Sequence, residues 1–353
     1  YESNMFSQEK QVKTYLLSWY KKNRRSLPWR KKNSNGLLNP YYVFVSEYML
    51  QQTTVNTVKI RFRQFIKRWP TLKVLAKASE PQILEFWSGL GYYSRARNLL
   101  KAIKIINKNF NNKIPNNYDE LIILPGVGDY TAKAILGIAY NQPIMPTDAN
   151  IERILVRLFA IQKPITKIKN ELKGLAEKFI SRKYSSDLIQ SFMDFGSIVC
   201  VPRNPKCEDC NINNICESNK KNISNILPMK IKRESTKPIK YTRAYVLINE
   251  NNEILVRNRP SKGMLASMLE VPNDNWVKDK KSLLSDQSIN HLKTKLFHKG
   301  SFEYSFSHFD LEADIYYGKI KKSEITSSKW IKKKNYTKSG LPTVMKKIVE
   351  MAI

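Results

Sequence analysis

Apolar residues in the first part of the chain recur at three- and four-residue spacing, the period of an amphipathic helix. The pattern is most regular over 41–69 and predicts one long helix there. Further helices are expected at 81–87, 94–109, 118–123, 129–140, 149–160 and 168–181. Because residues 1–200 show no strand-like alternation, we expect this part to be mainly α-helical.

The pattern changes after the last cysteine, at position 216. Residues 219–240 are charged, carry prolines and have no sustained period, so they are typical of a linker. Two β-rich runs within 241–260 predict a hairpin, 301–320 is strand-like, and 341–352 predicts a closing helix. We therefore expect a helical domain at 5–220, a linker at 221–237 and an α+β domain at 238–353.

Composition adds a strong positive charge. Among 353 residues there are 61 Lys and Arg against 30 Asp and Glu, a formal net charge of +31. This balance indicates a polyanionic partner, although a chain rich in Lys, Asn and Ile also fits an AT-rich genome. No apolar run approaches the roughly 18–20 residues that span a bilayer, and no secretory signal is visible, so we expect no membrane association.

The four cysteines lie within seventeen residues, in the spacing Cys-x6-Cys-x2-Cys-x5-Cys: Cys200, Cys207, Cys210 and Cys216. Such crowding predicts one metal site in a reducing compartment rather than a disulfide framework. Four thiolates can bind one zinc ion or an iron–sulfur cluster. Zinc sites more often use two Cys-x2-Cys pairs, but spacing alone leaves both possibilities open.

Residues 124–128, "LPGVG", are typical of a helix-hairpin-helix turn. Gly126 and Gly128 permit tight backbone conformations and the close approach of a phosphate, which the amides at the start of the next helix would face. A glycine-containing turn between two helices with no ligand is the alternative interpretation.

Two carboxylates stand out by their position. Asp148 directly precedes an apolar-periodic run, so we expect a helix N-cap whose pKa is lowered and which stays ionised. Glu47 lies on the predicted long helix and shares a face with Leu50, Gln51 and Thr54. A glutamate beside apolar residues is a candidate for a raised pKa and acid catalysis, whereas a solvated glutamate is the alternative.

Together these motifs resemble the MutY-type adenine DNA glycosylases of the endonuclease III-like superfamily. The resemblance runs in order from about residue 10 to 350 and rests on the cysteines and on six motifs: "LPWR" (27–30), "SEYMLQQT" (46–53), "GLGYYSRARNL" (89–99), "LPGVGDYTA" (124–132), "DAN" (148–150) and "FSH" (306–308). It implies a six-helix barrel and an iron–sulfur module with the active site between them. It also implies a [4Fe–4S] cluster on the four cysteines and a Nudix-like C-terminal domain that recognises 8-oxoguanine.

The resemblance also assigns roles to residues. Glu47 matches the general acid that protonates adenine N7, Asp148 matches the group that stabilises the sugar cation, and Asn150 matches a supporting active-site position. The remaining matches concern substrate binding: Gln52, Tyr92 and Leu50 beside the flipped base, Arg25, Trp29 and Arg30 in the adenine pocket, Gly126 and Gly128 in the hairpin, and Phe306, Ser307 and His308 near 8-oxoguanine.

Tyr130 distinguishes two reactions. In the bifunctional members of the superfamily a lysine at this place forms a Schiff base that leads to strand cleavage. Because a phenol cannot form an imine, Tyr130 predicts hydrolysis of the base without efficient strand cleavage. The resemblance further implies a monomeric enzyme, cytoplasmic and nucleoid-associated in a bacterial-type cell, that acts on duplex DNA with A:8-oxoguanine or A:G mispairs.

Three other functions fit the residues less well. An endonuclease III-type lyase would need a lysine at position 130, and a DNA-binding protein without catalysis would not need Glu47 and Asp148. A Nudix pyrophosphohydrolase would need a dense Glu cluster for Mg²⁺, whereas the stretch at and after "GMLASMLEVP" offers Glu270 and Asp274 and no such cluster. Two departures from the MutY-type pattern are an Asn/Lys-rich insertion between Arg30 and Tyr42, and alanine in place of glycine at 149.

Overall fold

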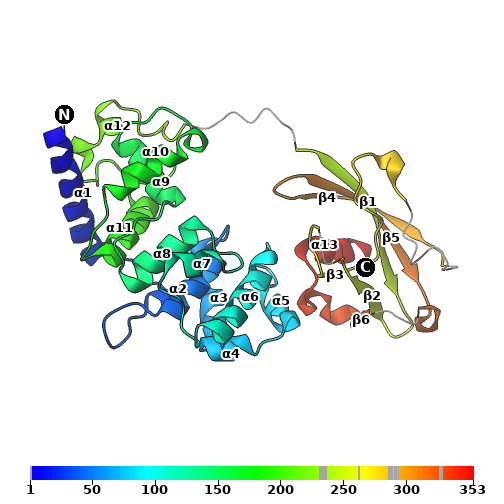
Figure 1. Ribbon diagram of the computed structural model, residues 1–353. Coiled ribbons are helices and arrows are strands. Elements are labelled where there is room, and N and C mark those ends of the chain that lie inside the picture. Colours follow the sequence, from blue (N-terminus) through cyan, green and yellow to red (C-terminus); the bar gives the residue numbers. More distant parts are fainter. Residues whose placement is uncertain are drawn as a thin grey trace. The chain divides into compact units, whose positions relative to one another are not determined.

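The computed structural model divides the chain into two compact units (Figure 1). The helical unit comprises residues 1–78 and 97–232, and the sheet unit comprises 79–96 and 233–353. The structure describes residues 2–229, 237–260, 263–284, 289, 292, 294–325 and 329–353. The predicted linker at 221–237 includes residues 230–236, which lie outside the described residues.

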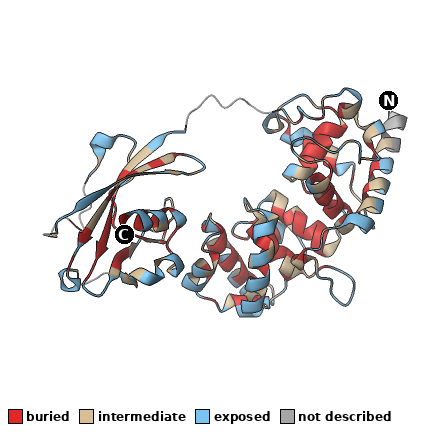
Figure 2. Cartoon of the chain, turned by 180° about the vertical axis from the view of Figure 1, so that it is seen from behind, coloured by how far each residue is buried: buried red, intermediate tan, exposed pale blue. Residues whose placement is uncertain are grey.

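The described part of the helical unit is built from helices and short turns. Its helices are α1 (Glu2–Asn23), α2 (Pro40–Leu50), α3 (Val55–Arg68), α4 (Leu72–Ala76), α6 (Ser94–Asn109, which begins in the sheet unit), α7 (Tyr118–Ile122), α8 (Asp129–Tyr140), α9 (Ala149–Leu158), α10 (Lys169–Glu177), α11 (Ser185–Ile198) and α12 (Glu217–Lys220). α2 packs against α8, and α11 packs against α1, α8 and α9. Buried residues lie along the inner sides of these helices (Figure 2).

The prediction of one long helix over 41–69 is wrong. α2 ends at Leu50 and α3 begins at Val55. Between them Gln52 has a φ of 56°, and the Thr54 hydroxyl accepts a hydrogen bond from the amide of Thr57 at 3.4 Å. A threonine that caps a new helix start competes with a continuous helix, so Thr54 does not share a helix face with Glu47. α11 was not among the predicted helices.

The described sheet unit contains α5 (Glu80–Trp87), six strands and α13 (Thr343–Ala352). The strands are β1 (Ile239–Ile248), β2 (Glu253–Asn258), β3 (Leu269–Glu270), β4 (Phe297–Ser305), β5 (Asp310–Lys319) and β6 (Lys329–Lys332). Their order is β3-β2-β1-β5-β4, with β6 paired to β2. β1 and β5 are parallel, and the other pairs are antiparallel.

Alternation along β1 places the sheet between two apolar clusters. Ala244 and Val246 belong to the cluster that includes the apolar side of α13, whereas Tyr245 and Leu247 belong to a second cluster with Leu255 and Ile320. The predicted β1–β2 hairpin and closing helix are confirmed, and with them the expected mainly α part followed by an α+β part. Among the described residues, no helix has the length and apolar character needed to cross a bilayer.

Candidate active site

The turn between α7 and α8 is the predicted hairpin. Gly126 has a φ of +82°, and a Cβ there would lie 2.9 Å from both Asn98 Cβ and Tyr48 Cε1, so only glycine fits. Gly128 is the N-cap of α8, and no atom lies within 4 Å of its added Cβ. The Tyr48 hydroxyl donates to the Pro125 carbonyl, which ties α2 to the hairpin.

Three predicted side chains meet beside this hairpin. Glu47 on α2 is 6% exposed. Tyr130 lies in the first turn of α8, and its hydroxyl donates a hydrogen bond to the Glu47 carboxyl. Asp148, the N-cap of α9, acts electrostatically on both groups. The structure therefore brings Glu47, Tyr130 and Asp148 together from three helices.

The electrostatics of this group centre on Glu47. Desolvation raises the pKa of the Glu47 carboxyl to about 7, and the nearby Asp148 charge adds to the rise against the hydrogen bond from Tyr130. The predicted rise in the pKa of Glu47 is thus confirmed. Burial and the two carboxylates also raise the pKa of Tyr130 well above its ordinary value, so the phenol stays neutral.

Asp148 caps its helix as predicted. Its side chain accepts hydrogen bonds from the Ile151 amide at 2.7 Å and from Asn150 Nδ2 at 2.8 Å. The expectation of a lowered pKa is wrong, however. Burial raises the pKa of Asp148 and outweighs the hydrogen bonds that favour the ionised form.

Asn150 is held from both sides. Its Nδ2 faces Asp148, while its Oδ1 accepts from Arg153 Nη2 at 2.9 Å. The same guanidinium donates to the carbonyls of Ala149 (3.1 Å) and Cys200 (2.8 Å). A Cβ at Gly196 would lie 2.7 Å from Asn150 Cβ, so α11 must carry glycine there. These contacts fix the orientation of the Asn150 amide.

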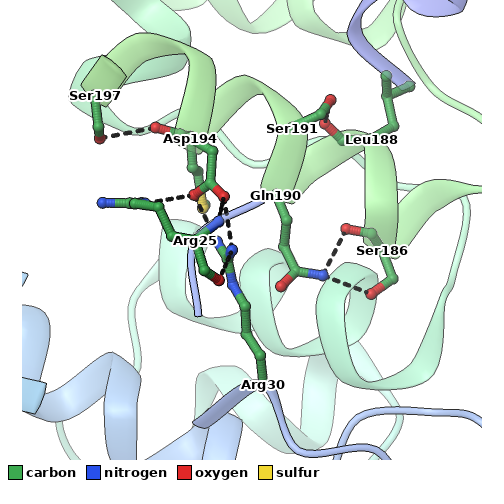
Figure 3. Close-up of polar contacts among 9 residues, drawn as sticks. Arg25, Arg30, Ser186, Leu188, Gln190, Ser191, Asp194 and Ser197 are labelled. Carbon is green, nitrogen blue, oxygen red and sulfur yellow. Dashed lines mark hydrogen bonds and ion pairs between the residues drawn. The ribbon is translucent and has the colours of Figure 1, made fainter. Parts of the chain in front are cut away.

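Arg25 and Arg30 converge on a residue that the sequence did not indicate (Figure 3). Asp194 on α11 has no exposed side-chain surface, and it accepts from Arg25 Nε and from Arg30 Nη1 and Nη2, each at 2.7 Å. Burial alone would raise the pKa of Asp194, but the two guanidinium groups outweigh it and lower the pKa. A lone aspartate among apolar residues, "SFMDFG", was the available signal.

Trp29 and the insertion lie close to these arginines in the sequence. Trp29 is buried and packs edge-on against Phe62, with ring centroids 5.5 Å apart. The insertion forms a small hairpin closed by a bridge between Lys32 and Leu38. It forms one wall of a cavity of about 590 Å³, which is also lined by Arg25 and Arg30.

Two of the residues expected beside the flipped base lie in irregular backbone. Gln52 and Tyr92 have φ values of 56° and 46°, a conformation uncommon outside glycine. Gln52 is exposed and Tyr92 is 43% exposed. Leu50 is the last residue of α2 and is partly buried.

The four cysteines line one small cavity together with Arg157. Arg157 Nη1 lies 3.4 Å from Cys200 Sγ, and the same guanidinium donates to the carbonyls of Val201 and Leu227. Among the described residues, no three His, Cys, Asp or Glu side chains are spaced to hold a single metal ion. Four separated thiols beside a cation fit an anionic cluster of four irons.

Residues 306–309 form the tight turn between β4 and β5, closed by the Phe306 amide donating to the Phe309 carbonyl at 2.9 Å. Phe306 packs against Trp276, Tyr304 and Phe309. Ser307 and His308 are exposed at the tip. The aromatic cluster therefore anchors the turn. The Ser307 hydroxyl is hydrogen-bonded to the Tyr92 hydroxyl, and the His308 side chain is exposed.

Comparison with known families matches three segments. Residues 45–179 match the HhH-GPD superfamily of base excision DNA repair proteins, residues 200–216 match the iron–sulfur binding domain of endonuclease III, and residues 243–351 match the NUDIX domain. The cysteines thus hold a [4Fe–4S] cluster rather than zinc.

Curated relatives match along the length of the chain. Adenine DNA glycosylase of Buchnera aphidicola subsp. Baizongia pistaciae is 33% identical, over 95% of this chain and 94% of that protein. The human adenine DNA glycosylase is 28% identical, over 94% of this chain and 72% of that protein.

Among solved structures, a thermostable thymine-DNA glycosylase matches with a TM-score of 0.55 and 26% identity, over 61% of this chain and 98% of that one. An endonuclease III–DNA covalent intermediate shares the fold, with a TM-score of 0.51, 21% identity and the same coverage of 61% and 98%. This chain is therefore a DNA glycosylase of base excision repair, and it belongs to the family of MutY-type adenine DNA glycosylases.

Proposed function

We propose that the protein removes adenine from duplex DNA where the adenine is mispaired with 8-oxoguanine or guanine, and that it does so by hydrolysis without cutting the strand. The observation that carries this proposal is the environment of the Glu47 carboxyl. This group is buried and accepts a hydrogen bond from Tyr130, and its pKa is raised to about 7. A group whose pKa lies near the working pH is suited to general acid catalysis.

Glu47 and Asp148 divide the chemistry between them. Adenine leaves deoxyribose once its N7 is protonated, and Glu47 supplies that proton. The remaining sugar resembles an oxocarbenium ion, and the Asp148 carboxylate stabilises its positive charge. Asn150 and the Ile151 amide donate to Asp148 and favour its ionised form. The negative charge of Asp148 in turn helps Glu47 to keep its proton.

Tyr130 limits the reaction to hydrolysis. Its neutral phenol cannot form an imine with the sugar, so no covalent lyase intermediate arises. Its hydroxyl instead donates to Glu47 and holds that carboxyl in place.

The other predicted residues bind the DNA substrate. A base inside the duplex is out of reach, so the adenine is flipped into a pocket. Arg25, Trp29 and Arg30 form part of that pocket, and Asp194 fixes both arginines. Gln52, Tyr92 and Leu50 fill the space left in the stack, and the hairpin at Gly126 and Gly128 holds the DNA backbone.

The exposed turn at Ser307 and His308 reads 8-oxoguanine, with Phe306 as its anchor. 8-Oxoguanine carries a hydrogen on N7, where guanine has only an acceptor. A serine hydroxyl can therefore accept a hydrogen bond from N7 of 8-oxoguanine but not from N7 of guanine. We also propose that the protein acts as a monomer on the nucleoid. The proposed domains are 5–220 and 238–353, joined by a linker at 221–237.

A Nudix pyrophosphohydrolase is disfavoured by the state of its two candidate carboxylates. Glu270 is ion-paired with Arg257 and Arg259, and Asp274 with Arg243. Carboxylates held by arginine have fewer free oxygens for Mg²⁺, which this chemistry requires.

The test is incubation with a duplex containing one A:8-oxoguanine pair, followed by division of the sample with and without hot alkali. We expect strand cleavage only after alkali, and none with a C:8-oxoguanine duplex. Cleavage without alkali would identify a lyase, and no cleavage in either sample would contradict excision.

A further inference from the structure

Asp129 creates an electrostatic conflict at the hairpin. It is the first residue of α8, directly after Gly128. A carboxylate at this end of a helix interacts favourably with the helix dipole. The same carboxylate would repel a DNA phosphate bound by the amides of that helix end, unless nearby cations offset its charge.

The structure supplies two such cations from different helices. Lys133, one turn further along α8, lies 3.2 Å from Asp129 Oδ1, and Lys173 on α10 lies 3.0 Å from Asp129 Oδ2. The Tyr118 hydroxyl donates to Oδ1 at 2.9 Å. Burial alone would raise the pKa of Asp129, but the contacts with Lys173, Tyr118 and Lys133 outweigh it and lower the pKa.

The resulting cluster keeps a positive charge that faces solvent. Two ammonium groups surround one carboxylate, and the side chains of Lys173 and Asp129 are 43% and 35% exposed. A lysine has three donors, so each ammonium can bond to Asp129 and still donate to a phosphate. One helical turn is about 5.4 Å long, so the cluster lies within about one turn of the start of α8. Electrostatic screening in salt acts over roughly 10 Å, so a phosphate bound at that helix end would still be attracted by the cluster.

We infer that Lys173 is a DNA-backbone contact contributed by α10, and that Asp129 is the positioning residue that holds Lys173 and Lys133 beside the hairpin. This inference rests on the proposed binding of the DNA backbone at Gly126 and Gly128. The alternative is that the cluster only ties α10 to α8 and has no role toward DNA.

The test is the affinity for an A:8-oxoguanine duplex over a series of salt concentrations, from roughly 50 to 200 mM. Lys173→Ala should weaken binding roughly three- to tenfold and lower the salt slope by about 1. Lys169→Ala is the matched control, because Lys169 lies on the same helix and is also ion-paired, with Glu152 at 3.4 Å. We expect Lys169→Ala to leave the slope unchanged.

Asp129→Asn separates positioning from simple repulsion. If Asp129 positions the lysines, losing its charge should weaken binding despite removing a negative charge, and Lys173→Ala should cost less in that background. Single-turnover excision at saturating protein should stay near wild type in the Lys169→Ala control.

Two results would overturn the inference: an unchanged salt slope in Lys173→Ala, or tighter binding by Asp129→Asn. Failure of the proposed function differs from both, since wild type itself would then neither bind nor excise.

Discussion

Glu47 in the helical unit and Glu270 in the sheet unit are two buried glutamates with opposite surroundings. Their exposed fractions are 6% and 2%. Glu270 accepts from Arg257 Nε at 2.9 Å, from Asn273 Nδ2 at 2.7 Å and from Arg259. Glu47 has a neutral phenol as its hydrogen-bond partner and a negative neighbour in Asp148. Burial is common to both glutamates, so what distinguishes them is the charge of the neighbouring groups: cationic around Glu270, and neutral or negative around Glu47.

Asp194 extends the comparison within the helical unit. It is as buried as Glu47, yet two arginines lower its pKa. A buried carboxylate with arginine partners organises its surroundings, whereas one without them is available for proton transfer. Among Glu47, Glu270 and Asp194, the proposed acid is thus the carboxyl that has no arginine of the described residues as a hydrogen-bond partner.

The substitution Glu47→Gln should have the largest effect, and it tests whether Glu47 acts as the general acid. Glutamine keeps the shape but has no proton to give to N7, so single-turnover excision should fall by roughly 10²–10⁴-fold. Binding of the lesion duplex should be nearly unchanged, as measured by a gel-shift titration. Excision within about tenfold of wild type, less than a general acid contributes, would remove Glu47 from the mechanism.

Asp148→Asn tests the second carboxylate. Loss of the charge that faces the sugar cation should slow single-turnover excision by roughly 10²–10³-fold. Because asparagine still accepts from the Ile151 amide, the free energy of unfolding should change by about 1 kcal/mol or less. A large loss of stability with normal excision would instead assign Asp148 to helix capping alone.

The double substitution Ser307→Ala with His308→Ala tests whether the sheet unit recognises the lesion. If the sheet unit reads the lesion, the preference for A:8-oxoguanine over A:G should fall roughly 10- to 100-fold. Excision at saturating protein should change less. The measurement is the ratio of the two affinities, and an unaltered ratio would place lesion recognition elsewhere.

Glu270→Gln should have the smallest effect on excision. It makes the same chemical change as Glu47→Gln at a glutamate that two arginines hold, so we expect near-normal single-turnover rates. The broken charge pairs should lower the free energy of unfolding by about 2–3 kcal/mol, measured by urea denaturation. A strong loss of excision in a folded Glu270→Gln protein would contradict the claim that Glu47 acts in catalysis and Glu270 does not.

Local features were predictable from the sequence. The hairpin at 124–128, the cap at Asp148 and the β1–β2 turn each depend on a few neighbouring residues, and all three are present. The raised pKa of Glu47 was also predictable, because apolar residues surround it in the sequence.

Features that depend on distant residues were not predictable. Asp194 meets Arg30 and Arg25 across 164 and 169 positions of the chain, and no local pattern reports such a pairing. The pKa of Asp148 has the opposite shift to that expected, because its cap is local but its burial depends on packing between helices. The break at 51–54 was not predictable, because apolar residues continue in helical period on both sides of it.

The central claim is that Glu47 acts as a protonated acid, and the pH dependence of single-turnover excision tests it most directly. Folding raises the carboxyl pKa from 4.5 to about 7, so the folded protein binds the extra proton, and stability from this group falls as pH rises through that window. Excision should be constant below a pH of about 7 and fall about tenfold per pH unit above it. A rate that stays constant or rises well above that pH would contradict the account.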